Sequence, residues 1–235
     1  MNSYFINASL LIMLLLSNSY SASADSSAEL KQEAYEEKKN LNAAFFFGPS
    51  LRTGTPSGAA GEDYKEFLEE LNSGYEFAGR AVYFPEDELG IGLAFSNYFS
   101  NNSDNNIIYE IDGTQYLVDI SEKVSIASLG IAGIYKKRVP ESKNILSLSA
   151  TLGFSSFSDE IDIGGISMEA AGLSFYSELG AGMDFNISEE LYLSLVAGLT
   201  TGSVDELKIE GETLELTNPE SLMRLWVKAG ISLWN

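Results

Sequence analysis

Apolar residues alternate with small or polar residues over most of the chain beyond residue 40. In 191–199, for example, leucine or alanine occupies every odd position. A period of two is typical of β-strands, because successive side chains point to opposite faces. The pattern predicts eight strands, near residues 41–53, 75–84, 89–95, 124–137, 146–154, 173–185, 191–199 and 225–233.

The two faces of these strands differ from those of a water-soluble sheet. One face carries Leu, Ile and Phe, and the other carries mostly Gly, Ser and Ala, whereas a soluble half-buried strand exposes Lys, Glu and Thr. Small residues suit the crowded interior of a narrow barrel, and the apolar face then needs an apolar solvent. We therefore expect an all-β fold, an eight-stranded antiparallel transmembrane up-and-down β-barrel. Its membrane-facing residues include Ile91, Leu93, Phe95, Leu179, Phe185, Leu193, Leu195 and Ile231.

The connections between the predicted strands alternate between short and long, as they do in transmembrane barrels. The short connections are 85–88, 140–144 and 187–190. The long ones are about 54–72, 100–123, 159–169 and 203–220. Aromatic residues near the strand ends suggest two interfacial belts. One contains Tyr83, Tyr135, Phe185 and Trp234, and the other Phe99, Phe157 and Phe175.

The last three long connections contain turn signals of their own. Asp112-Gly113, Gly164-Gly165 and Gly211 each lie between two alternating segments, and glycine in such places indicates a tight hairpin turn. We expect these connections to be protruding β-hairpins that prolong the barrel strands. Residues 62–72 predict a short amphipathic helix instead, with Tyr64 and Phe67 on its apolar face.

The N-terminal residues have the pattern of an export signal. A short apolar run, 10–16, precedes the small residues Ser21 to Ala24, which resemble a signal-peptidase site. The run is too short to span a bilayer as a helix. We therefore expect a signal peptide over 1–24, a polar periplasmic lead-in segment over 25–40 and the barrel over 41–235.

Composition excludes several function classes. The chain has no His and no Cys, and 34 acidic against 14 basic residues give a net charge of −20. Nucleic acid is not an expected partner, since phosphate binding needs clustered bases. Serine–histidine and cysteine–histidine catalysis and the commonest zinc sites are ruled out. We expect neither an enzyme nor a cofactor.

Two stretches, 177–202 and 225–234, resemble the small eight-stranded outer-membrane barrels, the group of the OmpA transmembrane domain, OmpX and OmpW. The resemblance covers about 41–235. It implies a Gram-negative cell outer membrane, contact with outer-membrane lipid, and insertion by the barrel-assembly machinery. This machinery reads a C-terminal aromatic residue in members of the group, and here Trp234 is penultimate, before Asn235. It also implies a β-ribbon collar above the membrane, on a barrel that we expect to be monomeric.

Seven charged side chains are expected inside the barrel from the parity of their positions. A narrow, low-dielectric lumen forces such charges to pair. A structural salt-bridge plug is the favoured interpretation, and a gate or selectivity ring is the alternative. This lumen polar network consists of Arg52, Glu76, Arg80, Glu178, Asp184, Arg224 and Lys228.

The four outer connections hold 20 acidic and three basic residues, and thus most of the net charge. Their carboxylates could bind an extracellular protein, or Ca²⁺ or Mg²⁺, although a solvated repulsive surface explains them as well. The candidate cation clusters are Glu206, Glu210 and Glu212 in one hairpin and Asp159, Glu160 and Asp162 in another.

Three functions therefore compete. The first is a non-enzymatic envelope barrel that is structural, or adhesive through its acidic extracellular collar. The second is a narrow pore for ions or small solutes, although eight strands leave little lumen. The third is a secreted lipocalin-like ligand-binding barrel. The outer faces argue against it, because their Leu, Phe and Ile side chains would then be exposed to water.

Overall fold

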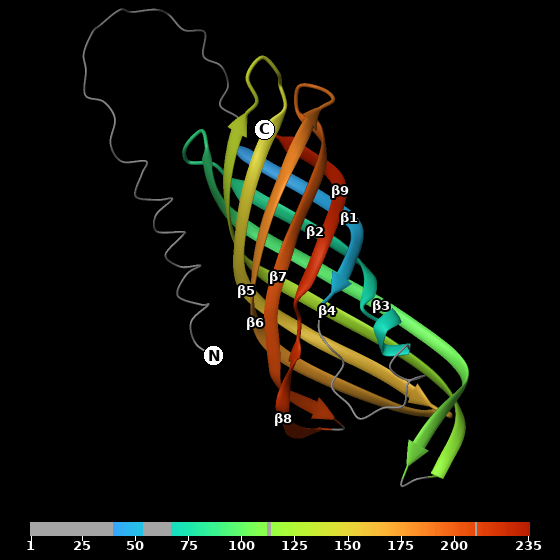
Figure 1. Ribbon diagram of the computed structural model, residues 1–235. Coiled ribbons are helices and arrows are strands. Elements are labelled where there is room, and N and C mark those ends of the chain that lie inside the picture. The colour runs from blue at the N-terminus through green and yellow to red at the C-terminus, as the bar shows by residue number, and fades with distance from the viewer. Residues whose placement is uncertain (1–39, 54–66, 112–113, 210) are drawn as a thin grey trace, which may run out of the picture. The chain divides into compact units, whose positions relative to one another are not determined.

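The computed structural model describes residues 40–53, 67–111, 114–209 and 211–235, which form almost entirely β-strands (Figure 1). The expected signal peptide and most of the lead-in segment lie outside these residues, as does Tyr64. The strands are β1 (Leu41–Arg52), β2 (Ser73–Tyr83), β3 (Leu89–Ile111), β4 (Thr114–Arg138), β5 (Ile145–Ile163), β6 (Ile166–Asn186), β7 (Leu191–Ile209), β8 (Glu212–Ser221) and β9 (Arg224–Trp234).

The sheet closes on itself. Each strand from β1 to β7 pairs antiparallel with the next along the chain, β7 also pairs with β9, and β9 pairs with β1. β8 and β9 both pair with β7 and are separated by Leu222 and Met223, so together they occupy one position in the ring. The ring thus has eight positions, and the predicted all-β up-and-down barrel is confirmed.

Three hairpins prolong the barrel at the end opposite the C-terminus (Figure 1). The β3–β4 pairing runs to Ile111 and Thr114, and the β5–β6 pairing runs to Ile163 and Ile166. Gly164 has a φ of 60° and Gly165 a φ of 87°, which suits glycine because it lacks a Cβ. The β7–β8 pairing forms the third hairpin. We call these three hairpins the collar.

The first long connection is described only from Phe67 onward. Residues 67–70 are helical, which agrees with the expected amphipathic helix as far as it can be followed. Phe67 and Leu71 are buried against Ile120 of β4. The Asn102 amide of β3 donates a hydrogen bond to the Phe67 carbonyl at 3.0 Å, so this turn is fastened to the inner face of the collar.

The outer face of the barrel is apolar around its whole circumference. Leucine, isoleucine, phenylalanine and valine side chains from all eight ring positions are exposed there, which is the girdle expected of a membrane-spanning barrel. Closure leaves no unpaired strand edge facing lipid. Among the described residues, no helix is long and apolar enough to cross a membrane. The residues predicted to face the membrane are exposed on this surface: Ile91, Leu93, Phe95, Leu179, Phe185, Leu193, Leu195 and Ile231.

Two residues assigned to the aromatic belts are not on the outer face. Trp234 is 1% exposed and Phe157 is 3% exposed, because both point into the barrel. Their position near a strand end suggested a belt, but the parity of each strand determines the face. Trp234 has the same parity as the buried Trp226, and Phe157 has that of the buried Ser155. Of the other belt residues, Tyr83, Tyr135, Phe185, Phe99 and Phe175 are exposed.

Candidate functional site: the barrel interior and the collar

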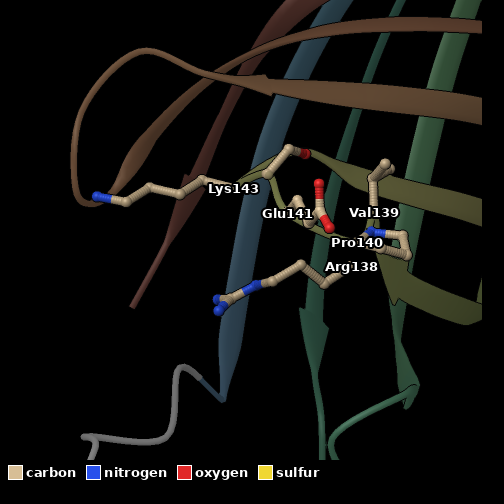
Figure 2. Close-up of a pocket in the computed structure, with 6 residues that line it drawn as sticks. Arg138, Val139, Pro140, Glu141 and Lys143 are labelled. Carbon is tan, nitrogen blue, oxygen red and sulfur yellow. The ribbon is translucent and has the colours of Figure 1, made fainter.

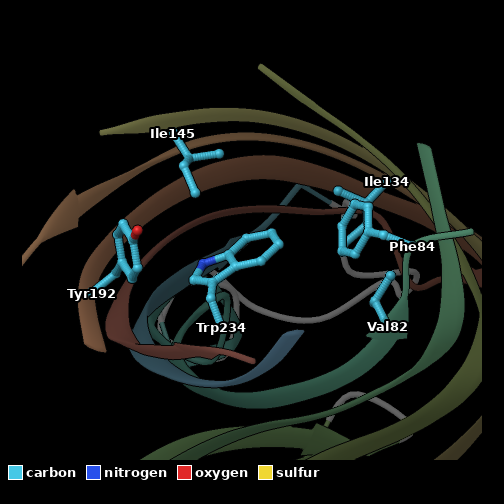
Figure 3. Close-up of a cluster of buried hydrophobic side chains, with 6 residues drawn as sticks. All are labelled: Val82, Phe84, Ile134, Ile145, Tyr192 and Trp234. Carbon is cyan, nitrogen blue, oxygen red and sulfur yellow. The ribbon is translucent and has the colours of Figure 1, made fainter. Parts of the chain in front are cut away.

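An apolar layer fills the interior at the end with the short turns. Trp234 lies at its centre, with Phe84 on one side and Tyr192 on the other (Figure 3). The Lys136 ammonium lies 4.0 Å from the centroid of the Phe84 ring and 4.4 Å from that of Trp234, within cation–π range. The remaining members of the layer are Val82, Ile134 and Ile145.

A second apolar layer fills the interior below the collar. Its buried side chains come from four strands (β3, β4, β5 and β7) and from the link between β8 and β9, which lie on different sides of the barrel. They are Tyr98, Val124, Ile126, Phe157, Val204 and Leu222. The predicted polar network lies between the two layers, apart from Arg52 at its collar end.

Glu76 of β2 holds two cations from β9. Its carboxylate lies 2.8 Å from the Lys228 ammonium and 3.5 Å from Arg224 Nε. Ser50 donates a further hydrogen bond to it at 3.4 Å. Glu76 and Arg224 are fully buried and Lys228 is 2% exposed, so these charges are shielded from water. Because removing one member of such a group leaves buried charge uncompensated, the group is strongly interdependent.

Glu178 of β6 forms a second group through a hydroxyl relay. Thr200 of β7 donates to the Glu178 carboxylate at 3.0 Å, and the Trp226 indole N–H donates to Thr200 Oγ1 at 3.1 Å. The Trp226 ring in turn lies 3.6 Å from the Lys228 ammonium. The Glu178 and Glu76 groups are therefore joined through Trp226.

Arg80 and Asp184 lie toward the apolar layer of Trp234. Arg80 Nε donates to the Asn42 side-chain oxygen at 3.1 Å, and its guanidinium stacks 5.1 Å from the centroid of the Phe46 ring. Asp184 accepts a hydrogen bond from the Trp234 indole at 3.3 Å. Unlike Glu76, these two charges are held mainly by neutral partners in the contacts described.

Arg52 does not join the other members of the predicted network. It binds Glu220 of β8 and donates to the Ser221 carbonyl at 3.3 Å. Of the seven predicted members, the structure joins Glu76 to Arg224 and Lys228 by ion pairs. Glu220 was missed because its segment was counted as an outer connection.

Glycines make room for the interior rings. A Cβ on Gly198 would lie 2.4 Å from the Trp226 ring and 2.3 Å from the Leu179 carbonyl oxygen. A Cβ on Gly180 would lie 2.9 Å from the same ring. The small residues on the inner face are therefore needed because a large side chain from another strand fills the space beside them.

The interior suits a plug better than catalysis. Three acids and three bases balance in the spanning part, Glu76, Glu178 and Asp184 against Arg80, Arg224 and Lys228. Apolar layers lie on both sides of them. In the part of the chain that the structure describes, no three acidic side chains come together to hold a metal ion. The expected cation clusters therefore find no preformed site there, and Glu210 lies outside the described residues.

A basic turn lies at the end opposite the collar, between β4 and β5. A surface pocket of about 500 Å³ is lined by its residues, and the Arg138 and Lys143 side chains extend to the same side of the turn (Figure 2). Glu141 lies between them and has a φ of 59°. Asp87 and Glu88 belong to the adjacent turn, whose Glu88 carbonyl accepts the Lys136 N–H, so this rim carries both signs of charge.

The outer faces of the collar bring like charges together. Glu160 of β5 is directly opposite Glu169 of β6, and Glu206 of β7 is opposite Glu215 of β8. Lys123 lies opposite Glu160 at 3.9 Å, and this pair is largely exposed. Opposed carboxylates destabilise a sheet unless a cation or a basic partner lies nearby.

Comparison with known proteins gives the fold alone. No family model and no curated protein sequence matches the chain. Among solved structures, a major outer membrane protein of Thermus thermophilus is 14% identical with a TM-score of 0.48, and 82% of this chain and 99% of that chain are covered. The outer membrane protein OprG of Pseudomonas aeruginosa is 13% identical, with a TM-score of 0.44 and coverages of 84% and 97%.

A third similar structure is that of Ail, the attachment invasion locus protein of Yersinia pestis, in complex with the heparin analogue sucrose octasulfate. It is 14% identical, with a TM-score of 0.42 and coverages of 82% and 99%. The class of this protein follows from its own geometry: a closed antiparallel barrel with an apolar girdle is the architecture of outer-membrane proteins. The chain is an outer-membrane β-barrel with a filled interior.

Proposed function

We propose that the barrel is a non-enzymatic anchor in the outer membrane and that the acidic collar is its extracellular binding surface. The observation that supports this most is the contrast between the two parts. Buried side chains fill the interior, whereas three hairpins extend past the apolar girdle and carry most of the net charge. The protein then serves the envelope as a structural element that holds a partner at the cell surface.

The partner that fits the collar is a basic, extended polypeptide segment. Among the described residues β8 pairs with β7, and its opposite edge has backbone N–H and C=O groups available for a further strand. Strand addition uses such edges, and side-chain charge then selects the partner. β8 carries Glu212 and Glu215 beyond the Glu220 that Arg52 binds, so Lys or Arg side chains on an added strand would meet opposite charge.

The test is binding of a labelled Lys/Arg-rich peptide to the barrel in lipid nanodiscs, followed by fluorescence anisotropy. We expect binding that weakens as salt is raised, because Glu212 and Glu215 are exposed at the surface of the collar. Deleting 204–219 should abolish the binding and leave heat-modifiable barrel folding intact. A polyanion such as sucrose octasulfate serves as the control and should not bind.

Binding that survives the deletion would show that the collar is not the binding surface. A matched variant, Glu206→Gln combined with Glu212→Gln and Glu215→Gln, keeps the hairpin and removes only charge. If it binds the peptide as tightly as the parent, electrostatic recognition is wrong even where the deletion abolishes binding.

A further inference from the structure

Two acidic side chains point into the barrel at the base of the collar. Glu122 of β4 is 6% exposed, and Asp159 of β5 pairs in register with Val124, the next inward-facing residue of β4. Their outward neighbours Lys123 and Glu160 are charged and largely exposed. This level of the barrel therefore lies beyond the apolar girdle.

Each of the two carboxyls has an oxygen without a partner. Glu122 Oε2 and Asp159 Oδ1 are buried, and neither has a hydrogen-bond partner in the structure. Glu122 pairs with Ile161 and Asp159 pairs with Val124, so the two carboxyls are diagonal neighbours on the inner face of two paired strands. An ionised carboxylate only accepts hydrogen bonds, so two of them cannot satisfy each other. A proton on one carboxyl supplies the donor that two ionised carboxylates lack.

The surrounding charges do not neutralise the pair. Arg52 of β1 and Glu220 of β8 are the charged groups that face it, and they bind each other. The Arg52 guanidinium is therefore the one positive group beside three carboxyl groups, those of Glu122, Asp159 and Glu220, among the charges named here. This differs from the spanning part of the barrel, where acids and bases are equal in number.

The environment of the pair is apolar on both sides. On the collar side lie Ile120 and Ile161, in the cluster that includes Phe67. On the membrane side lie Val124 and Phe157, in the apolar layer below the collar. Water cannot easily solvate a second negative charge in such a place, so burial favours retention of the proton.

We propose that Glu122 and Asp159 form a proton-binding carboxyl pair that fastens β4 to β5 at the base of the collar, and that loss of the shared proton opens the collar. The collar then responds to external pH while the barrel stays folded. This inference concerns the collar's conformation, and it stands whether or not a basic segment binds there.

The pKa values give the direction of the response. Burial, aided by the Asp159 carboxylate, raises the pKa of Glu122 from 4.5 to about 8. Burial also raises the pKa of Asp159 from 3.8 to about 6. Because the closed state binds more protons than the open one, closure is favoured at low pH and weakens as pH rises through 8. One proton changes the opening equilibrium about tenfold per pH unit, or about 100-fold between roughly pH 6 and 8.

The experiment is amide hydrogen exchange of the full chain in detergent micelles, corrected for the chemical exchange rate at each pH. We expect exchange in 118–124 and 157–161 to rise about 100-fold between roughly pH 6 and 8. Glu122→Gln retains a donor for Asp159 and should remove this dependence. Glu160→Gln, next to Asp159 on the exposed face of β5, should keep the pH dependence.

A direct titration of the carboxyl carbons by NMR provides the second readout, with Asp159→Asn as the second variant. Two separated transitions, one of them several pH units above its ordinary position, support the pair. Titration of both groups near 4 would overturn the proposal. Millimolar Ca²⁺ or Mg²⁺ that protects the collar in the parent but not in Glu122→Gln would also overturn it, since the occupant would then be a cation.

Discussion

We predict that Glu76 is the position in the barrel interior where the loss of a charge destabilises the protein most. Glu76→Gln keeps the shape of the side chain and removes the negative charge. Arg224 then retains its hydrogen bond to the Leu222 carbonyl at 3.2 Å. Lys228 retains its cation–π contact with Trp226, in which the ammonium lies 3.6 Å from the ring centroid. Neither contact supplies a counter-charge, so two buried cations lose the carboxylate that pairs with them directly.

The magnitude follows from that loss. Breaking a buried ion pair by removing one partner destabilises a protein by about 3–5 kcal/mol. The ratio of folded to unfolded protein should fall by more than about 100-fold, since about 1.4 kcal/mol is a factor of ten in an equilibrium constant. Lys228→Met should be milder, because Glu76 keeps Arg224 at 3.5 Å. The double variant Glu76→Gln/Lys228→Met should be more stable than Glu76→Gln alone, since it leaves one unpaired cation.

The assay is equilibrium urea unfolding in lipid vesicles, followed by the fluorescence of Trp226 and Trp234, the two tryptophans of the chain. Glu215→Gln, on the exposed collar, is the matched control and should stay within about 0.5 kcal/mol of the parent. If Glu76→Gln were equally mild, or the double variant were the least stable of the set, the interior would not be a network of paired buried charges.

Three further predictions test other parts of the structure. Gly198→Val should destabilise the barrel by about 1–3 kcal/mol in the same urea assay, because its side chain meets the Trp226 ring and a backbone oxygen. Leu195→Arg on the girdle should destabilise the barrel by about 2–4 kcal/mol in vesicles. Glu206→Arg, at an exposed position of the collar, should cost little. Planar bilayers should stay electrically silent for the parent and for Arg224→Ala, since apolar layers remain on both sides; steady conductance would revive the narrow pore.

Strand positions and faces were predictable from the sequence because they depend on local parity. Successive side chains alternate across a strand whatever the partner is, so Leu193 and Ser194 could be assigned to opposite faces. The same rule corrects the belt assignment of Trp234 and Phe157, which was based on position along the strand. Where two signals disagreed, parity was the better guide, since it is a constraint of backbone geometry.

Partners across the lumen were not predictable in the same way. The stagger of the strands around a barrel determines which inward-facing residues lie at the same height. The sequence of a single strand does not reveal this stagger. Arg52 and Glu220 are 168 residues apart, and Glu76 and Lys228 are 152 apart. Glu122 and Asp159 were not assigned to the interior because both were counted with the surface charge of the outer connections, although their parity indicates the interior.

The central claim is that the Leu193 face of β7 contacts hydrocarbon while the Ser194 face fills the interior. Because the chain has no cysteine, Leu193→Cys and Leu195→Cys can each carry one fluorescent label before refolding into vesicles. Brominated acyl chains should quench the labels at 193 and 195, and an aqueous quencher such as iodide should not. Ser194 is fully buried, so an unlabelled Ser194→Cys variant should resist a thiol reagent that is added to the folded protein. Iodide quenching at 193 and 195 would contradict the membrane barrel.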